Sequence, residues 1–358
     1  MNSEPRSPES GEFQPKITLK NANRLKVLGT LLTLGGLLLF AYFVYSTGVH
    51  EIAANIEHFG WAGFAVIIGI YALRIWLRAY AWKLSVYEPY HLSLDDTIPA
   101  VIIGEATSSM IPLGILISGT AKAVAVRSKV PLVVGLSSVA TENLFYSFTT
   151  SVFLILGALT FVRNFALDET TTITIDVLIG VIAVVVVFLA LLIIRQWHFA
   201  SEACESLYRR GWFPKLLENG RMQVRLFENL IYGFYRRHPK RFLPICLAEV
   251  AFHMLGVVEV WFILTRIVEP AGEFLNAFLL ESVSRLITIV FKLVPFLIGV
   301  DEAGAQYVAE TVGLVAAIGV TLAIIRKGRI LFWTAIGLLL IVKRGLSLRE
   351  IREADKPR

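Results

Sequence analysis

Charged residues are scarce in this chain of 358 residues. Only 17% of them are Asp, Glu, Lys or Arg, whereas 56% are hydrophobic. A soluble domain usually carries about 25% charged residues. Several apolar runs reach the roughly 20 residues that a helix needs to span a bilayer. The runs lack the alternation of barrel strands. The composition therefore predicts an all-α, polytopic helical membrane protein.

Cysteine is also rare, and the motifs of nucleotide chemistry are missing. The two cysteines, Cys204 and Cys246, suggest neither a disulfide framework nor a zinc site. The sequence has no P-loop, no Gly-rich dinucleotide turn and no Ser nucleophile elbow. We therefore expect no cofactor and no metal, and ATP-driven pumping by this chain alone is disfavoured.

The net charge of +6 comes from basic residues that lie beside the apolar runs. This placement favours anionic or phosphate-bearing membrane lipids as partners, rather than nucleic acid. Since cytosolic loops are rich in Lys and Arg, we expect a multi-pass protein of the cell (inner) membrane with a cytosolic N-terminus. We expect residues 1–24 to be a disordered cytosolic tail, residues 25–345 a transmembrane domain and residues 346–358 a polar C-terminal tail. The oligomeric state stays open, a homo-oligomer included.

The apolar runs predict seven or eight spans and one or two broken or re-entrant helical segments. The expected spans are Leu25 to Tyr45, Trp61 to Trp82, Pro131 to Val162, Ile173 to Ile194, Phe242 to Ile267, Val308 to Ile325 and Ile330 to Val342. The interrupted segments are Thr97 to Val126 and Phe274 to Val300. We expect the first to enter and leave on the cytosolic side. The second either spans fully, which places the C-terminal tail in the cytosol, or re-enters and makes the two halves an inverted repeat.

A basic stretch, residues 195–240, separates the halves. Apolar residues recur in it at helical spacing, from Leu217 through Phe227 to Phe234, and arginines occupy much of the remaining surface. Two interpretations stay open. The stretch is either an amphipathic helix on the inner leaflet or an ordinary cytosolic helical hairpin.

The interrupted segment Thr97 to Val126 carries the strongest functional signal. Pro112, Gly114 and Gly119 break it, and it also holds Glu105 and Lys122. Unpaired backbone groups and bare charges in hydrocarbon each cost several kcal/mol. Such a segment persists only where protein or a wet cavity surrounds it. It therefore indicates a polar site inside the membrane, with free N–H groups at helix ends to receive an anion.

Other ionisable groups lie within the expected spans. Arg74 and Arg78 share a helix face, and their guanidinium groups suit phosphate. The alternative is a structural pairing with Glu105 or Glu142. Glu142 and Asn143 lie near mid-bilayer, where they could pair with Arg74, relay protons, bind a headgroup or simply join helices.

Two later groups have helical spacing. Glu249 and His253 are four residues apart. A hydrogen-bonded pair explains them better than a metal site, since no third ligand is near. One helix face carries a polar stripe of Glu281, Arg285, Thr288 and Lys292. A second Pro and Gly break follows it, with Pro295, Gly299 and Glu302. Because a Ser follows three residues after both Glu105 and Glu281, two similar half-sites or mere coincidence can explain the pattern.

The break at Ile111 to Gly114, then Lys122, the long span with Glu142 and Asn143, and the late break from Pro295 to Glu302 together resemble a known family. This is the transmembrane domain of lysylphosphatidylglycerol synthases, a flippase-like family. The resemblance covers most of Leu25 to Val342. It implies translocation of lipid between leaflets, or assistance to a lipid-modifying pathway. Because only about sixteen residues follow Val342, we expect no aminoacyl-transferase domain of the kind that some relatives carry, and their enzyme activity is not carried over.

The leading hypothesis is a protein that moves a lipid or lipid-linked headgroup between leaflets through a polar groove. The substrate-binding candidates are Arg74, Arg78, Glu105, Lys122, Glu142, Asn143, Arg285, Lys292 and Glu302. No catalytic residue is assigned, and an enzyme is not the favoured class. Two alternatives remain: a membrane glycosyl or headgroup transferase that uses a lipid-phosphate donor, and a non-catalytic partner of a lipid-biosynthesis complex.

Overall fold

The computed structural model describes residue 38 and residues 40–110, 114–211, 214–268, 273–290 and 297–343. The predicted first span, apart from its last residues, lies outside these ranges, as do both tails. The described part contains helices and no strands. The helices are α2 (Val49–Leu84), α3 (Leu94–Met110), α4 (Gly114–Ala125), α5 (Leu132–Asn164), α6 (Glu169–Arg195), α7 (Phe199–Arg209), α8 (Pro214–Arg237), η1 (Pro239–Arg241), α9 (Phe242–Ile267), α10 (Phe274–Val290), α11 (Val300–Thr311) and α12 (Ala316–Lys343).

Four helices are long and apolar enough to cross a membrane: Val49–Leu84, Leu132–Asn164, Glu169–Leu191 and Pro239–Ile267. They confirm four of the predicted spans. The first of these helices bends at Gly60, where φ is 62°. Only glycine adopts this conformation without strain, so the straight part of α2 begins at Trp61, where the predicted span begins.

One span prediction was wrong. The sequence suggested two short spans, Val308 to Ile325 and Ile330 to Val342, joined by a basic loop. The structure instead has one helix, α12, that runs through these basic residues from Ala316 to Lys343. Each of the three basic residues in its middle has a carboxylate partner on another helix. Pairing lowers the free-energy cost of burying these charges, so the helix can continue through them.

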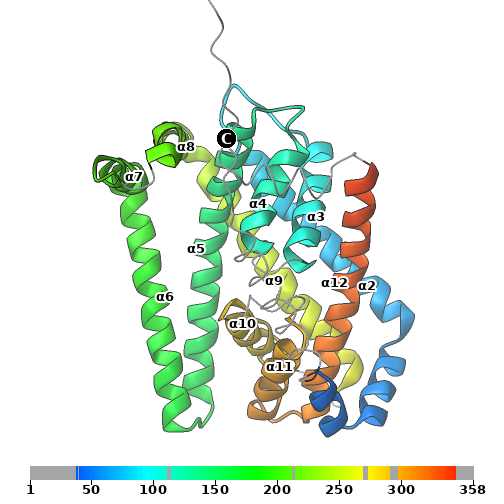
Figure 1. Ribbon diagram of the computed structural model, residues 1–358. Coiled ribbons are helices and arrows are strands. Elements are labelled where there is room, and N and C mark those ends of the chain that lie inside the picture. The colour runs from blue at the N-terminus through cyan, green and yellow to red at the C-terminus, as the bar shows by residue number, and fades with distance from the viewer. Residues whose placement is uncertain are drawn as a thin grey trace, which may run out of the picture.

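The same order of helices, one long, two short and one long, occurs twice in the described part of the chain. The first set is α2, α3, α4 and α5, and the second is α9, α10, α11 and α12. The short helices match in length, since α3 and α10 have 17 residues each and α4 and α11 have 12. In Figure 1 the first pair of short helices occupies the upper half of the bundle and the second pair the lower half. The long helices α2 and α9 run in opposite directions along the bundle (Figure 1). The described part of the chain therefore forms an inverted repeat.

Helices α7 and α8 form a helical hairpin at the upper end of the bundle (Figure 1). The hairpin contacts the loop between α2 and α3. Arg237 donates to the hydroxyl of Tyr87 at 2.6 Å, and Arg241 donates to the carbonyl of Val86 at 3.1 Å. The loop and the hairpin thus lie at the same end. The segment α3–α4 also starts and finishes at this end (Figure 1).

Close helix packing holds the bundle. Because lipid is as apolar as Leu, membrane helices associate through small residues that let backbones approach. At Gly319 of α12 an added Cβ would lie 2.3 Å from the carbonyl oxygen of Ala305 on α11. At Gly337 it would lie 2.4 Å from the Cβ of Ala106 on α3. Helix α12 therefore contacts one short helix of each repeat.

Candidate functional site

The polar site begins on α2, where Tyr71, Arg74 and Arg78 recur at helical spacing. Residues three and four apart share one face of a helix, and this face of α2 turns toward α9 and α12. Arg74 is 2% exposed. A guanidinium buried this deeply persists only where other groups pair with it.

Glu281 of α10 gathers three of those partners. Its carboxylate, which is fully buried, forms ion pairs with Arg285 one turn further along α10, with Arg326 of α12 at 2.8 Å and with Arg74 at 3.7 Å. These three arginines come from three different helices. One carboxylate thus joins both repeats.

Glu259 of α9 is the second buried carboxylate here. It pairs with Arg74 at 3.1 Å and also with Arg329 of α12. The guanidinium of Arg329 lies 4.1 Å from the ring centroid of Tyr71, a cation–π distance. The hydroxyl of Tyr71 in turn donates to Glu105 of α3 at 2.8 Å. A continuous chain of polar contacts therefore links α9, α12, α2 and α3.

We call this group the central cluster. It consists of Arg74, Glu259, Glu281, Arg285, Arg326 and Arg329. Its four cations face two carboxylates. The Nε atoms of Arg74, Arg285 and Arg329 are buried and have no hydrogen-bond partner among the described residues. The central cluster therefore has both positive charge and hydrogen-bond donors to offer an anion.

A second group, the flanking cluster, surrounds Glu142 of α5. Arg78 donates to Glu142 at 2.9 Å and to the side-chain oxygen of Asn143 at 3.2 Å. Lys122 of α4 lies 3.6 Å from the other Glu142 oxygen. Glu249 of α9 is fully buried and interacts with the same carboxyl group and the same two cations. The flanking cluster is Arg78, Lys122, Glu142, Asn143 and Glu249.

Aromatic side chains connect the two clusters. The guanidinium of Arg78 lies 4.0 Å from the ring centroid of Tyr146, and that of Arg74 lies 4.4 Å from the centroid of Phe252. The hydroxyl of Tyr146 accepts a hydrogen bond from Arg285 at 3.3 Å. An electron-rich ring face stabilises a desolvated cation without neutralising it. These contacts therefore leave the positive charge of the clusters in place.

Glu302 lies apart from both clusters. Its carboxylate accepts a hydrogen bond from the backbone N–H of Gly299 at 2.8 Å and so caps the start of α11. It also pairs with Lys327 of α12 at 2.5 Å, and Lys327 lies 3.8 Å from Asp301. These contacts account for Glu302 as a residue that fixes the start of α11.

The structure thus divides the residues predicted from sequence. Arg74 and Arg285 lie in the central cluster, and Glu105 reaches it through Tyr71. Four others lie in the flanking cluster: Arg78, Lys122, Glu142 and Asn143. Lys292 lies outside the described residues. The sequence interpretation missed Arg326 and Arg329, which it placed in a loop, and did not include Glu259. Continuing the helical pattern through the basic residues of α12 would have placed both arginines inside the membrane.

The proposed pair on α9 was wrong. His253 lies 3.0 Å from the hydroxyl of Thr150 on α5, not beside Glu249, and its ring stacks on Phe153 and Tyr146. Glu249 interacts with Glu142 of α5 instead. Both residues share a face of α9 as predicted, but that face packs on α5, which supplies separate partners. Among the described residues, no group of three or more His, Cys, Asp or Glu side chains could hold a metal ion.

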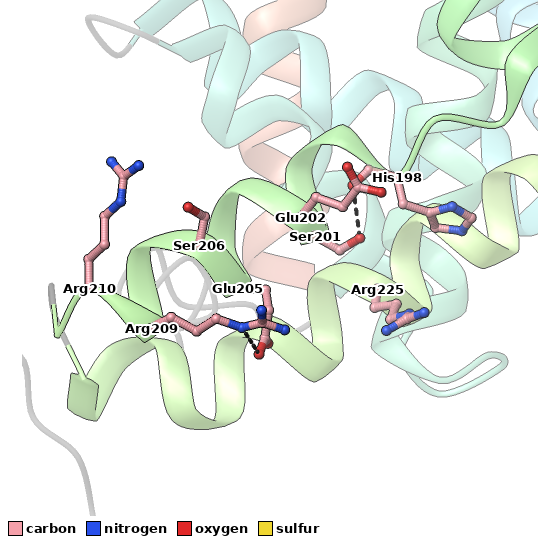
Figure 2. Close-up of a pocket in the computed structure, with 8 residues that line it drawn as sticks. All are labelled: His198, Ser201, Glu202, Glu205, Ser206, Arg209, Arg210 and Arg225. Carbon is pink, nitrogen blue, oxygen red and sulfur yellow. Dashed lines mark hydrogen bonds and ion pairs between the residues drawn. The ribbon is translucent and has the colours of Figure 1, made fainter.

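A cavity of about 710 Å³ lies between α7 and α8 (Figure 2). It is lined by His198, Ser201, Glu202, Glu205, Ser206, Arg209, Arg210 and Arg225. None of these residues belongs to either cluster. Two glutamates and three arginines line it, and Glu205 pairs with Arg209 across one helical turn. This pair is exposed, unlike the ion pairs of the two clusters, so the buried clusters remain the candidate site.

Comparison with known families matches residues 26–337 to the lysylphosphatidylglycerol synthase TM region. The chain belongs to this family. The match includes every residue of the two clusters and extends into α12, and it confirms the resemblance that the sequence motifs suggested. With its apolar helices, the family membership makes this a multi-pass membrane protein. No curated protein and no solved structure matches the chain.

Proposed function

We propose that this protein moves a lipid with an anionic, phosphate-bearing headgroup between the leaflets of the membrane. The headgroup passes along the central cluster while the acyl chains stay in the bilayer. The observation that carries the proposal is the charge of the central cluster. Four guanidinium groups, of which those of Arg74 and Arg329 are buried, share two carboxylates, and three of their Nε donors have no acceptor among the described residues. Phosphate oxygens suit this geometry because guanidinium groups bind them with paired donors.

The helix arrangement supports the same function. Transporters with inverted repeats bind substrate near mid-membrane, where broken helices of the two repeats approach each other. Here α4 and α11 each begin at the inner end of a short-helix pair, so the positive ends of two helix dipoles point toward the middle of the bundle (Figure 1). Such ends attract an anion.

The basic residues indicate which end of the bundle lies in the cytosol. We assign the α7–α8 hairpin and the N-terminal tail to the cytosol of a cell membrane. The C-terminal end of α12 lies at the same end as this hairpin (Figure 1). The segment α3–α4 then enters from the cytosol and α10–α11 from the opposite side. With the predicted span Leu25 to Tyr45, this proposal has six crossings, the others being α2, α5, α6, α9 and α12. The proposal assigns the basic C-terminal tail to the cytosol, as the charge rule favours.

A proteoliposome assay tests the proposal. Fluorescently labelled phosphatidylglycerol is incorporated in both leaflets, and a membrane-impermeant quencher reports the lipid that reaches the outer leaflet. The purified protein is expected to accelerate this movement, and Arg326→Gln to slow it. The loss of one charge-assisted hydrogen bond is worth about 1.5–3 kcal/mol, which corresponds to a rate about 10 to 150 times lower.

The matched control is Arg266→Gln, which removes the same charge from an exposed position near the end of α9. Its rate should equal that of the wild type. Arg326→Lys keeps the charge and should retain part of the activity. The lipid should be recovered chemically unchanged, which separates transport from headgroup transfer. The proposal fails if the protein accelerates the movement of neither anionic phospholipids nor isoprenoid-linked phosphates between the leaflets.

A further inference from the structure

Glu249 is the buried ionisable group that the lipid pathway leaves unexplained. Its side chain is 0% exposed. In the described ranges, no hydrogen-bond donor reaches either of its carboxyl oxygens. An ionised carboxylate without donors is costly inside a membrane protein. Some feature of its surroundings must therefore stabilise this group.

The carboxyl group of Glu142, on the neighbouring helix α5, interacts with that of Glu249. The two cations of the flanking cluster form ion pairs with Glu142. Arg78 donates to Glu142 at 2.9 Å, and Lys122 lies 3.6 Å from its second oxygen. That second oxygen also accepts no hydrogen bond from a described residue. Two carboxyl groups thus lie together, with hydrogen-bonding capacity left on both.

Paired carboxyl groups of this kind hold a proton between them, because two adjacent negative charges oppose each other in a site from which water is excluded. We propose that Glu142 and Glu249 together bind one exchangeable proton, and that this proton crosses the membrane with the anionic lipid. The second part of this inference rests on the proposed function.

Charge balance explains the coupling. With both carboxyl groups ionised, their two negative charges cancel those of Arg78 and Lys122. With the proton bound, the flanking cluster carries one net positive charge. A phosphate in the neighbouring central cluster therefore favours the protonated pair, and by thermodynamic linkage the proton favours lipid binding. A singly charged lipid and one proton move together without net charge.

The other ionisable groups that interact with the pair or with its two cations come from five helices. They are Arg78 of α2, Glu105 of α3, Lys122 of α4, Tyr146 of α5 and Cys246 of α9, and Tyr235 of α8 interacts with Cys246. Tyr146 also accepts from Arg285, which belongs to the central cluster. Tyr146 thus contacts both clusters, Arg78 through its ring and Arg285 through its hydroxyl group, so a change of charge in one cluster affects the other.

Infrared spectroscopy tests proton binding without any lipid assay. Purified wild-type protein is titrated with acid and base, and the carbonyl absorption of a protonated carboxyl group is followed. One buried carboxyl band should titrate, and Glu249→Gln should remove it. The control Glu310→Gln changes an exposed carboxyl group of α11 and should leave this band in place. If the wild type has no such band, or Glu249→Gln retains it, the proton site is overturned.

Coupling is tested in proteoliposomes with a gradient of one pH unit. For one coupled proton, the wild type should bring labelled phosphatidylglycerol to a steady-state ratio of about tenfold between leaflets, and Glu249→Gln should give an equal distribution. Lipid movement in the wild type without this asymmetry overturns coupling but leaves the proposed function standing. No lipid movement at all refutes the proposed function and with it the coupling, while the infrared band still decides the proton site.

Discussion

Neutralising Glu281 should destabilise the protein more than any exposed charge change. The carboxylate of Glu281 is fully buried and pairs with Arg74, Arg285 and Arg326. Glu281→Gln keeps the shape of the side chain and removes its charge. Four guanidinium groups would then share Glu259 alone. Removing one partner of a buried ion pair costs about 3–5 kcal/mol, because the other charge stays buried without compensation.

The magnitude can be measured by reversible denaturant unfolding in detergent micelles. The expected loss is about 3–5 kcal/mol in the free energy of unfolding for Glu281→Gln. Glu57→Gln, at an exposed position on α2, should change it by less than about 0.5 kcal/mol. The double variant Glu281→Gln/Arg326→Gln should lose less than the sum of its single variants, since the uncompensated charge is removed as well.

Two results would contradict this reasoning. A change below about 0.5 kcal/mol for Glu281→Gln would mean that water or lipid already compensates these arginines. If the free-energy changes of the two single variants add up to that of the double variant, Arg326 and Glu281 do not interact, which would contradict their 2.8 Å separation. A soluble phosphate ester or an anionic lipid should also restore part of the lost stability, because it supplies the missing negative charge.

Two further predictions concern packing and pH. Gly319→Ala places a Cβ 2.3 Å from the carbonyl oxygen of Ala305, so thermal unfolding in detergent should show a loss of about 1–3 kcal/mol; Gly180→Ala, which meets nothing within 4 Å, is the control. In the loop before α6, hydrogen bonds from Thr171 hold the pKa of Asp168 below its ordinary value. That contribution to stability is present above the ordinary pKa and is lost as the pH falls through the lowered one. The amide NMR signal of Thr171 should shift over that range and stop responding in Asp168→Ala.

The sequence predicts the parts of this fold that depend on local pattern. Apolar length alone locates α5 and α6, and Trp61 marks where the straight part of α2 begins. The break between α3 and α4 follows from Pro and Gly in an apolar run. These features depend on neighbours in the chain, so that one sequence is enough to find them.

The errors concern contacts between distant residues. Three basic residues within four positions of α12 suggested a loop, because bare charges do not stay in a membrane helix. In the structure Arg326 pairs with Glu281, Lys327 with Glu302 and Arg329 with Glu259. These partners lie between 25 and 70 residues away in the chain. No periodicity within α12 could indicate that they would be adjacent. The same limit applies to Glu249, whose partner lies on α5.

Each repeat also has an ion pair between two of its own long helices. In the first repeat Arg78 of α2 pairs with Glu142 of α5, and in the second Glu259 of α9 pairs with Arg329 of α12. Each repeat thus has an ion pair between its first and last long helices, with the signs of the charges exchanged.

Among the described residues, the ion pairs between the repeats are fewer than those within them and all involve Arg74, which pairs with Glu259 and Glu281 of the second repeat. Alternating access in inverted-repeat transporters moves one repeat against the other. Such a motion would preserve the ion pairs within each repeat and break those of Arg74. An anionic headgroup that replaces the carboxylates around Arg74 would lower the cost of breaking them. The residue that binds the lipid and the residue that holds the repeats together would then be the same one.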